Sequence, residues 1–240
     1  MFSQNPRLKG LAIIIGLFAF GVVATAFLQA TGWDLSLSAR FYTPGGAYGG
    51  WTLARHSPWD LIYDYGEYPM WILIVVALAL CVSALSGKVS RGYLKPSLVI
   101  ILTAALGPGI LVNGILKPGW GRPRPSEIKI MGGDQEYRKV WEPAGPGQGR
   151  SFTCGHCAMA YSVTSAVAFY PLHPVIAVAA LVGGITYGTA AGMARLVQGG
   201  HFATDALWSG VLVLMLVTAL YYLVFRIPES SYESRPPPYQ

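Results

Sequence analysis

Six apolar segments dominate this chain, and each approaches the length of about 20 residues that a helix needs to cross a membrane. Hydrophobic residues make up 53% of the sequence and charged residues only 12%, about half the charge of a typical soluble domain. Because a helix satisfies its own backbone hydrogen bonds inside lipid, we expect an all-α integral membrane bundle of six transmembrane helices. The segments lie at about 11–30, 68–86, 97–116, 157–171, 175–193 and 205–225.

The length of 240 residues allows one such bundle and no sizeable second domain. We expect the membrane domain to cover residues 1–226. The tail 227–240 is polar and proline-rich, which predicts disorder. The first apolar run is long for a signal peptide, so we expect a retained membrane anchor.

An even number of crossings places both termini on one side of the membrane. The short loops on that side hold seven Lys and Arg residues, against ten in the longer loops opposite. Long loops count for little in the positive-inside rule. We therefore expect cytoplasmic termini in a bacterial-type inner (cytoplasmic) membrane, with the longer loops facing the periplasm.

The net charge of +6 suits anionic headgroups and an anion site. The sequence has no basic run with interleaved aromatic residues, so we expect the membrane bilayer and no nucleic acid as partner. The loop at about 31–67 is rich in Trp and Tyr, which gather at membrane interfaces. Within it, Ser57–Tyr65 predicts a short amphipathic helix, which would act either as an interfacial anchor or as a gate for substrate.

Three polar clusters lie at the ends of apolar segments, on the side opposite the termini. Charged groups near lipid are costly and mark a functional site. We expect these loops and helix ends to form an active site on one face of the bundle. The clusters are Lys117–Pro125, Ser151–His156 and Arg195–Asp205.

The third cluster places His201 and Asp205 four residues apart, on one face of a helix. A carboxylate there can hold one ring nitrogen and leave the other as a nucleophile. The alternative is a buried pair that ties helices together. The guanidinium of Arg195, just before, can grip phosphate oxygens.

The first cluster joins Lys117 to Arg122 and Arg124, which prolines hold in a stiff turn. The residue types alone do not separate the two arginines. In the second cluster, Gly155 and His156 begin a helix, whose N-terminus favours anions. His156 is then placed to protonate a leaving oxygen.

Together the clusters resemble the type 2 phosphatidic acid phosphatase superfamily, whose soluble relatives include vanadium haloperoxidases. The family pattern is K-x6-R-P, P-S-G-H and S-R-x5-H-x3-D. Here Lys117, Arg124 and Pro125 match the first motif, and Gly155 and His156 match half of the second. The third is matched by Arg195, His201 and Asp205. The likeness covers about residues 68–225.

The resemblance implies that His201 attacks phosphorus, that Asp205 orients it and that His156 protonates the leaving group. Phosphate oxygens would be held by Lys117, Arg124, Arg195, the Gly155 amide and Cys154, which stands at the position of a phosphate-contacting serine. No metal and no cofactor are implied, because cations stabilise the developing charge.

Three positions depart from the family pattern: Thr153 replaces proline, and Cys154 and Ala194 replace serines. Two hydroxyl donors are thereby lost, while the backbone amides remain, so we expect activity. The Cys154–Cys157 pair also reads as C-x-x-C. Its context favours neither a redox enzyme nor a zinc site. The two cysteines either form a disulfide or fill space as buried thiols.

We therefore expect a membrane lipid phosphatase that acts through a phosphohistidine. Its substrate would be a phosphorylated lipid: phosphatidylglycerol phosphate, phosphatidic acid, undecaprenyl pyrophosphate or a lipid A phosphate. A lipid-to-lipid phosphotransferase would carry the same residues. The alternative from another class is a catalytically silent protein on the same fold that binds or transports lipid.

Overall fold

The computed structural model describes residues 5–227, and their regular secondary structure is helical, which confirms the predicted all-α class. The tail expected at 227–240 lies outside the described residues, apart from Ile227. The long elements are α1 (Pro6–Ala30), α4 (Tyr68–Leu85), α5 (Leu94–Ala104), the π-helical η4 (Ala105–Leu116), α8 (Pro174–Val197), α9 (Ala203–Thr218) and η8 (Ala219–Val224). The short ones are α2 (Trp33–Ala39), η2 (Tyr48–Gly50), α3 (Trp59–Tyr65), η3 (Arg91–Tyr93), α6 (Lys117–Trp120), η5 (Pro125–Glu127), η6 (Lys129–Met131), α7 (Gly155–Ser162) and η7 (Val163–Phe169).

Five helices of the described chain are long and apolar enough to cross a membrane, one fewer than predicted. The missing segment is the eight-residue α7 with the seven-residue η7 that continues it. It is shorter because it begins inside the second polar cluster and ends at the turn around Pro171. Nearly all of its side chains are buried by other helices, so this segment has little contact with lipid.

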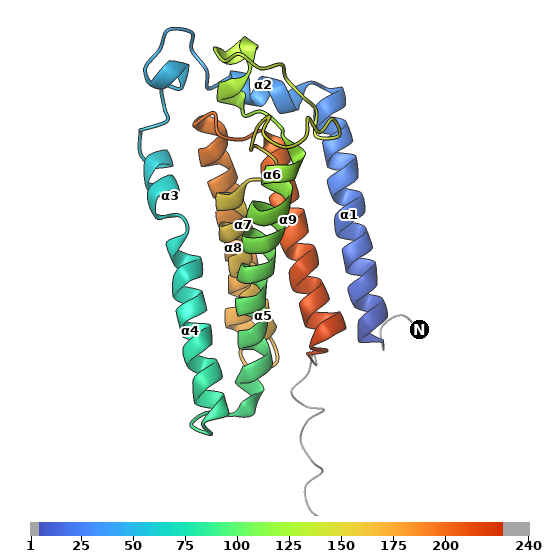
Figure 1. Ribbon diagram of the computed structural model, residues 1–240. Coiled ribbons are helices and arrows are strands. Elements are labelled where there is room, and N and C mark those ends of the chain that lie inside the picture. The colour runs from blue at the N-terminus through green and yellow to red at the C-terminus, as the bar shows by residue number, and fades with distance from the viewer. Residues whose placement is uncertain (1–4, 228–240) are drawn as a thin grey trace, which may run out of the picture.

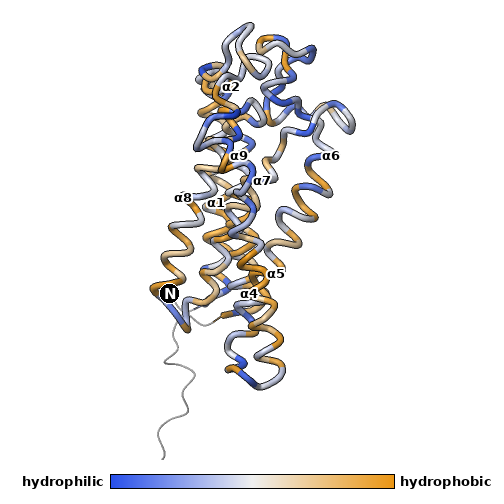
Figure 2. Tube along the Cα trace, turned by 90° about the vertical axis from the view of Figure 1, so that its left-hand side faces the viewer, coloured by the Kyte–Doolittle hydropathy of each residue, from blue (hydrophilic) through white to orange (hydrophobic). Residues whose placement is uncertain are grey.

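The helices stand side by side and their connections divide between the two ends of the bundle (Figure 1). The N-terminus of α1 and the end of η8 lie at one end, and the loops that carry the three polar clusters lie at the other. Hydrophobic residues follow the middle of the helices, whereas hydrophilic residues gather in the cluster-bearing loops and at the α4–α5 turn (Figure 2). This distribution fits a multi-pass membrane protein.

Helix α1 packs against α9 and η8 and belongs to the bundle. The hydroxyl of Thr25 accepts a hydrogen bond from the indole Nε1 of Trp208 at 2.9 Å. A Cβ atom at Gly21 would lie 3.3 Å from that same indole ring, so a small residue allows the close approach. The first apolar run is thus packed as an integral helix.

Small residues also let the bundle close around α7. The ring of Tyr161 lies against Gly188 of α8 and Gly210 of α9, and added Cβ atoms at either glycine would overlap it. The Tyr161 hydroxyl is 3.2 Å from the Thr189 hydroxyl. These contacts fix the height and rotation of α7, and hence of the polar residues at its start.

Replacement of Gly188 by alanine should therefore destabilise the protein, because the new methyl group meets the Tyr161 ring. Overpacking of this kind costs about 1–3 kcal/mol. The matched control is Gly183→Ala on the same helix, where nothing lies within 4 Å of the added atom and helix propensity favours alanine by about 1 kcal/mol. Thermal unfolding in detergent should show a lower midpoint for the first variant and an unchanged or higher one for the second. Equal midpoints would contradict this packing.

Candidate active site

His201 lies in the short connection between α8 and α9, where it is almost fully buried. Its ring nitrogen Nδ1 is 2.7 Å from the backbone oxygen of Ser151. A carbonyl oxygen only accepts hydrogen bonds, so Nδ1 carries the proton and donates it. Nε2 is then the unprotonated nitrogen, the form that a nucleophilic imidazole needs.

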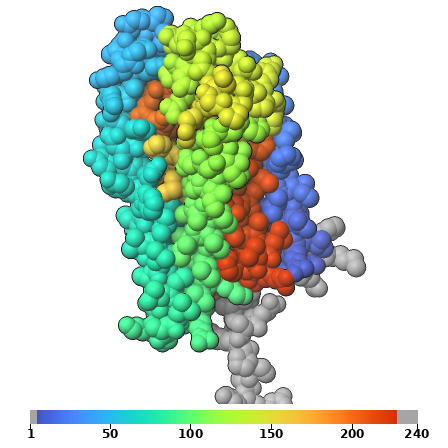
Figure 3. Space-filling model, viewed as in Figure 1, coloured from blue at the N-terminus to red at the C-terminus, as the bar shows by residue number. Residues whose placement is uncertain are grey.

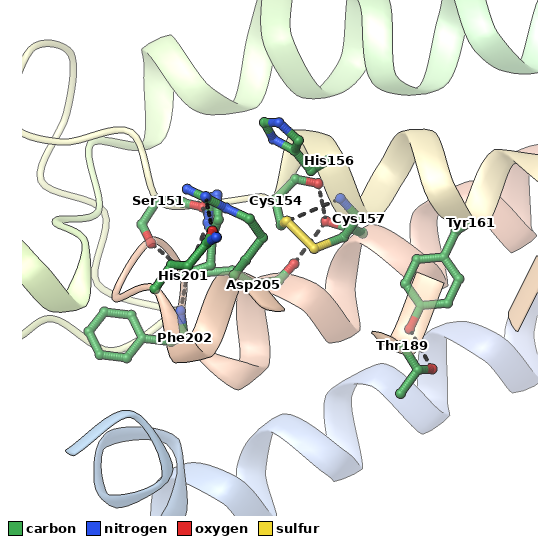
Figure 4. The surroundings of a disulfide bond; sticks show 12 residues. Ser151, Cys154, His156, Cys157, Tyr161, Thr189, His201, Phe202 and Asp205 are labelled. Carbon is green, nitrogen blue, oxygen red and sulfur yellow. Dashed lines mark hydrogen bonds and ion pairs between the residues drawn. A yellow bond between two sulfur atoms is a disulfide. The ribbon is translucent and has the colours of Figure 1, made fainter. Parts of the chain in front are cut away.

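The Asp205 carboxylate lies beside this ring but does not hold it by the expected direct hydrogen bond, because Asp205 Oδ2 is 3.7 Å from His201 Nδ1. Instead Oδ2 accepts from the Ser151 hydroxyl at 2.6 Å and from the Phe202 amide at 2.9 Å. The carboxylate thus fixes Ser151, and the Ser151 carbonyl fixes the imidazole (Figure 4). Ser151 was part of a predicted cluster, but this role was not foreseen.

The two arginines of the first cluster have different places in the structure. The Arg122 side chain is fully buried and donates to Asp205 Oδ1 at 2.6 Å and to Asp34 Oδ2 at 2.7 Å. It also donates to the Thr204 hydroxyl at 2.8 Å and to the Arg138 carbonyl at 3.0 Å. Arg122 is therefore held in a buried ion-pair network under the site and is not free to bind an anion.

Asp34 at the start of α2 completes this network. Its carboxylate also accepts from the Thr204 amide and hydroxyl, both at 2.9 Å, and from the Tyr137 hydroxyl at 3.1 Å. Asp34 was not among the predicted residues. The available signal was an acidic residue a few positions after an apolar run, because a charge near lipid needs a partner.

Lys117, Arg124 and Arg195 lie close to His156, and Lys117 and Arg195 also lie close to His201. All three cations lie close enough to His156 to lower the pKa of its imidazole, and they also lie close to one another. The buried Nε atoms of Arg124 and Arg195 and the Thr153 hydroxyl have no hydrogen-bond partner within the described chain. Unpaired buried donors are costly, and a group of them beside a cationic cluster suits an anion with several oxygens.

The backbone at Gly155 brings Lys117 to the first turn of α7. A Cβ atom at position 155 would lie 2.8 Å from Lys117 Nζ and 3.1 Å from Asn113 Oδ1. Asn113 in turn donates to the Pro108 carbonyl at 2.8 Å, within the π-helical η4. Pro108 has no N–H to donate to the helix ladder, and the Asn113 side chain satisfies a carbonyl in the widened turn. Asn113 was not among the predicted residues.

Cys154 and Cys157 form a disulfide, one of the two alternatives that the sequence left open. Cys154 is fully buried, its Sγ accepts from the Cys157 amide, and its own amide faces the Asp205 carbonyl at 3.5 Å. The expectation that Cys154 contacts phosphate does not fit this arrangement, because neither its sulfur nor its amide is directed to the pocket. The amide of Gly155 at the start of α7 remains available for that role.

Burial lowers the pKa of His201 below its usual range, and the nearby cations Arg195 and Lys117 lower it further, although Asp205 opposes them. Burial also lowers the pKa of His156, with Arg195, Lys117 and Arg124 acting in the same direction. Both imidazoles are therefore neutral at neutral pH in the empty pocket. A bound phosphate would bring negative charge that counteracts the cations and favours protonation of His156.

Helix α3 and the residues that follow it also contact His156 and Arg195. The Tyr63 ring stacks on His156 with ring centres 4.8 Å apart, and the Arg195 guanidinium lies 4.5 Å from the centre of the Tyr63 ring. Glu67 Oε1 is 3.7 Å from His156 Nε2. The predicted short helix at 57–65 thus exists as α3 and lines the site.

A gap in the surface separates α3 and α4 from the segment that holds η4 and α6. Figure 3 shows parts of α7 and of the end of α8 through this gap. The gap lies in the half of the bundle nearest the cluster-bearing loops.

A buried imidazole close to a cluster of cations suits an enzyme that acts on a phosphorylated substrate. The chain belongs to the PAP2 superfamily, whose pattern it matches over residues 97–229. This membership confirms the resemblance described above. The protein is accordingly a membrane phosphatase that hydrolyses phosphoric monoesters of lipids.

Curated relatives share one name. The chain is 28% identical to the lipid A 4'-phosphatase of Francisella tularensis subsp. novicida (strain U112), over 90% of this chain and 97% of the relative. It is 34% identical to that of Rhizobium leguminosarum over 51% of this chain and 52% of the relative. A third, from Rhizobium etli, is 25% identical over 90% of this chain and 89% of the relative. No solved structure matches the chain.

The different places of the two arginines predict different effects of their loss. Arg122→Met leaves the carboxylates of Asp34 and Asp205 buried without their cation, which should destabilise the fold by about 3–5 kcal/mol. Arg124→Met removes a cation from the pocket and should leave the unfolding midpoint near that of the wild type while phosphate release falls. Thermal unfolding in detergent, paired with a phosphate assay, measures both. Equal midpoints for the two variants would refute this division.

Proposed function

We propose that this chain removes the 4'-phosphate of lipid A through a phosphohistidine intermediate on His201. The observation that carries the proposal is the geometry at His201: Nδ1 donates to the Ser151 carbonyl, which leaves Nε2 unprotonated, and the cations Arg195 and Lys117 lie close to the ring. The choice of lipid A rests on the name lipid A 4'-phosphatase, which the relatives share. This chain covers 97% and 89% of the length of two of them.

In the first step the lone pair of Nε2 attacks phosphorus, and the bond from phosphorus to the lipid oxygen breaks. His156 gives a proton to that oxygen, so the lipid leaves as an alcohol. Lys117, Arg124, Arg195 and the Gly155 amide stabilise the charge on the phosphoryl oxygens. The Ser151 carbonyl holds the Nδ1 proton throughout, with Asp205 behind it.

In the second step water attacks the phosphoryl group, and the bond from phosphorus to Nε2 breaks. His156, now neutral, accepts a proton from the water. Inorganic phosphate leaves, and His201 regains its neutral form with the proton on Nδ1. The chemistry in both steps is supplied by side chains and one backbone amide of this chain.

His201→Gln should abolish phosphate release from lipid A while the protein still folds in detergent. The glutamine keeps polarity and similar size but has no nucleophilic ring nitrogen. Phosphate release and mass spectrometry of the lipid, including fragmentation to locate the lost group, provide the measurement. Phosphatidic acid, phosphatidylglycerol phosphate and undecaprenyl pyrophosphate serve as comparison substrates.

Residual activity within tenfold of the wild type in the glutamine variant would exclude His201 as nucleophile. Faster hydrolysis of one of the comparison lipids would overturn the choice of lipid A and keep the enzyme class. Transfer of the phosphate to a second lipid, without its release, would show a phosphotransferase instead.

We also infer that the termini are cytoplasmic and that the pocket faces the periplasm. The positive-inside distribution supports this orientation, and both ends of the described chain lie opposite the cluster-bearing loops. With Cys81 replaced by serine, Gln148→Cys should react with a membrane-impermeant maleimide in spheroplasts, whereas Ser86→Cys should not; both positions are exposed. The reverse labelling pattern would invert the orientation.

A further inference from the structure

Tyr63 and Glu67 lie outside the three polar clusters and outside the residues that match the family. Both nevertheless contact the ring of His156. Tyr63 covers one face of the imidazole at 4.8 Å with an interplanar angle of 26°. Glu67 approaches its edge, with Oε1 3.7 Å from Nε2. The ring is thus bounded on a face and at one nitrogen by a segment that the mechanism above does not use.

We propose that Tyr63 and Glu67 are positioning residues for His156. The Tyr63 ring fixes the plane of the imidazole, and the Glu67 carboxylate pairs with Nε2 while His156 carries its proton. Nδ1 is then the nitrogen that donates to the leaving oxygen. This inference rests on the proposed function, because it assumes that His156 acts as the acid of the first step.

The charges around His156 explain why a carboxylate is needed there. Three cations face the ring: Lys117 from the start of α6, Arg124 from the following loop and Arg195 from the end of α8. All three repel the protonated imidazole and thereby disfavour the charged form of His156. Glu67, at the start of α4, is the carboxylate within ion-pair distance of the ring among the described residues. It offsets part of this repulsion at the moment when the acid must be charged.

Besides His156, Tyr63 contacts Arg195, and this second contact holds the Tyr63 ring in place. The Arg195 guanidinium lies 4.5 Å from the centre of the Tyr63 ring, a distance at which a cation is attracted to an aromatic face. Arg195 is anchored by a 2.6 Å hydrogen bond to Gln198 Oε1, and Gln198 donates to backbone oxygens at Ala54 and Trp59. The phosphate-facing cation and the ring that orients the acid are therefore parts of one contact network.

The proton balance is complete within the site. As the bond from phosphorus to the lipid oxygen breaks, its electron pair moves to oxygen, and the Nδ1 proton of His156 follows. His156 becomes neutral while Glu67 stays anionic. In the second step the attacking water returns a proton to Nδ1, which restores the His156–Glu67 charge pair before the product leaves.

The test compares two leaving groups. A lipid alkoxide needs a proton to depart, whereas the nitrophenolate of 4-nitrophenyl phosphate departs without one. The quantity compared is kcat/KM, because it reports the steps up to departure of the leaving group and not the hydrolysis step that both substrates share. Glu67→Gln should lower kcat/KM for the lipid substrate about tenfold or more and change kcat/KM for 4-nitrophenyl phosphate little. Tyr63→Leu should show the same selectivity, and Tyr63→Phe, which keeps the ring, should restore activity.

Asp64→Asn is the matched control, because Asp64 is an exposed acid on the same segment and the substitution removes the same charge. Its rates should equal those of the wild type with both substrates. His156→Asn tests the proposed function separately and should show the same leaving-group selectivity as Glu67→Gln. The double variant Glu67→Gln/His156→Asn should lose no more activity than His156→Asn alone, because Glu67 acts through the His156 ring.

Equal losses with both substrates in Glu67→Gln would reveal a purely structural role and overturn the inference. Unchanged rates in Glu67→Gln, with selective loss in His156→Asn, would overturn it as well and leave the proposed function standing. If His156→Asn shows no selectivity, the acid assignment and the inference fall together. Absence of phosphate release by the wild-type protein from every substrate would refute the proposed function itself.

Discussion

The ion pairs that Arg122 makes with Asp34 and Asp205 are the interaction on which the site depends. Charges buried in a bundle are expensive, and they persist only with good geometry and additional hydrogen bonds. Here Thr204, Tyr137 and Ser151 supply those hydrogen bonds. The network joins the start of α2, the loop after α6 and the start of α9. Through Ser151 it also fixes the tautomer of His201, so buried groups set the protonation of the imidazole that we propose as the nucleophile.

The pocket above this network is poor in negative charge. Lys117, Arg124 and Arg195 gather around two imidazoles that burial keeps neutral. Such a site is incomplete electrostatically until an anion enters, and the anion's own charge then favours protonation of His156. In the proposed mechanism, Coulomb interactions therefore link the binding of phosphate to the protonation of His156.

Much of this arrangement could be predicted from the sequence, because apolar length and motif spacing are local properties. The helical class, the membrane location and the family follow from them. The different places of Arg122 and Arg124 could not be predicted, since the burial of Arg122 depends on its ion pair with Asp34, 88 residues earlier in the chain. The Ser151 carbonyl as the partner of His201 is a backbone contact without a sequence signal. The short central α7 was predicted as a full span because hydropathy does not distinguish burial by protein from burial by lipid.

The family pattern covers residues 97–229, yet Asp34, Tyr63 and Glu67 reach the centre of the site from earlier in the chain. Suppose that the motif-bearing half were joined to the N-terminal half of a distant relative. Such a chimera would retain every motif, Asp205 included, but it would lose the Asp34 carboxylate beside Arg122 and the contacts of Tyr63 and Glu67 with His156 unless the relative supplied the same residues. The motif-bearing half is therefore not an interchangeable module. The first 70 or so residues carry no motif, yet through Asp34, Tyr63 and Glu67 they contribute side chains that contact Arg122 and His156.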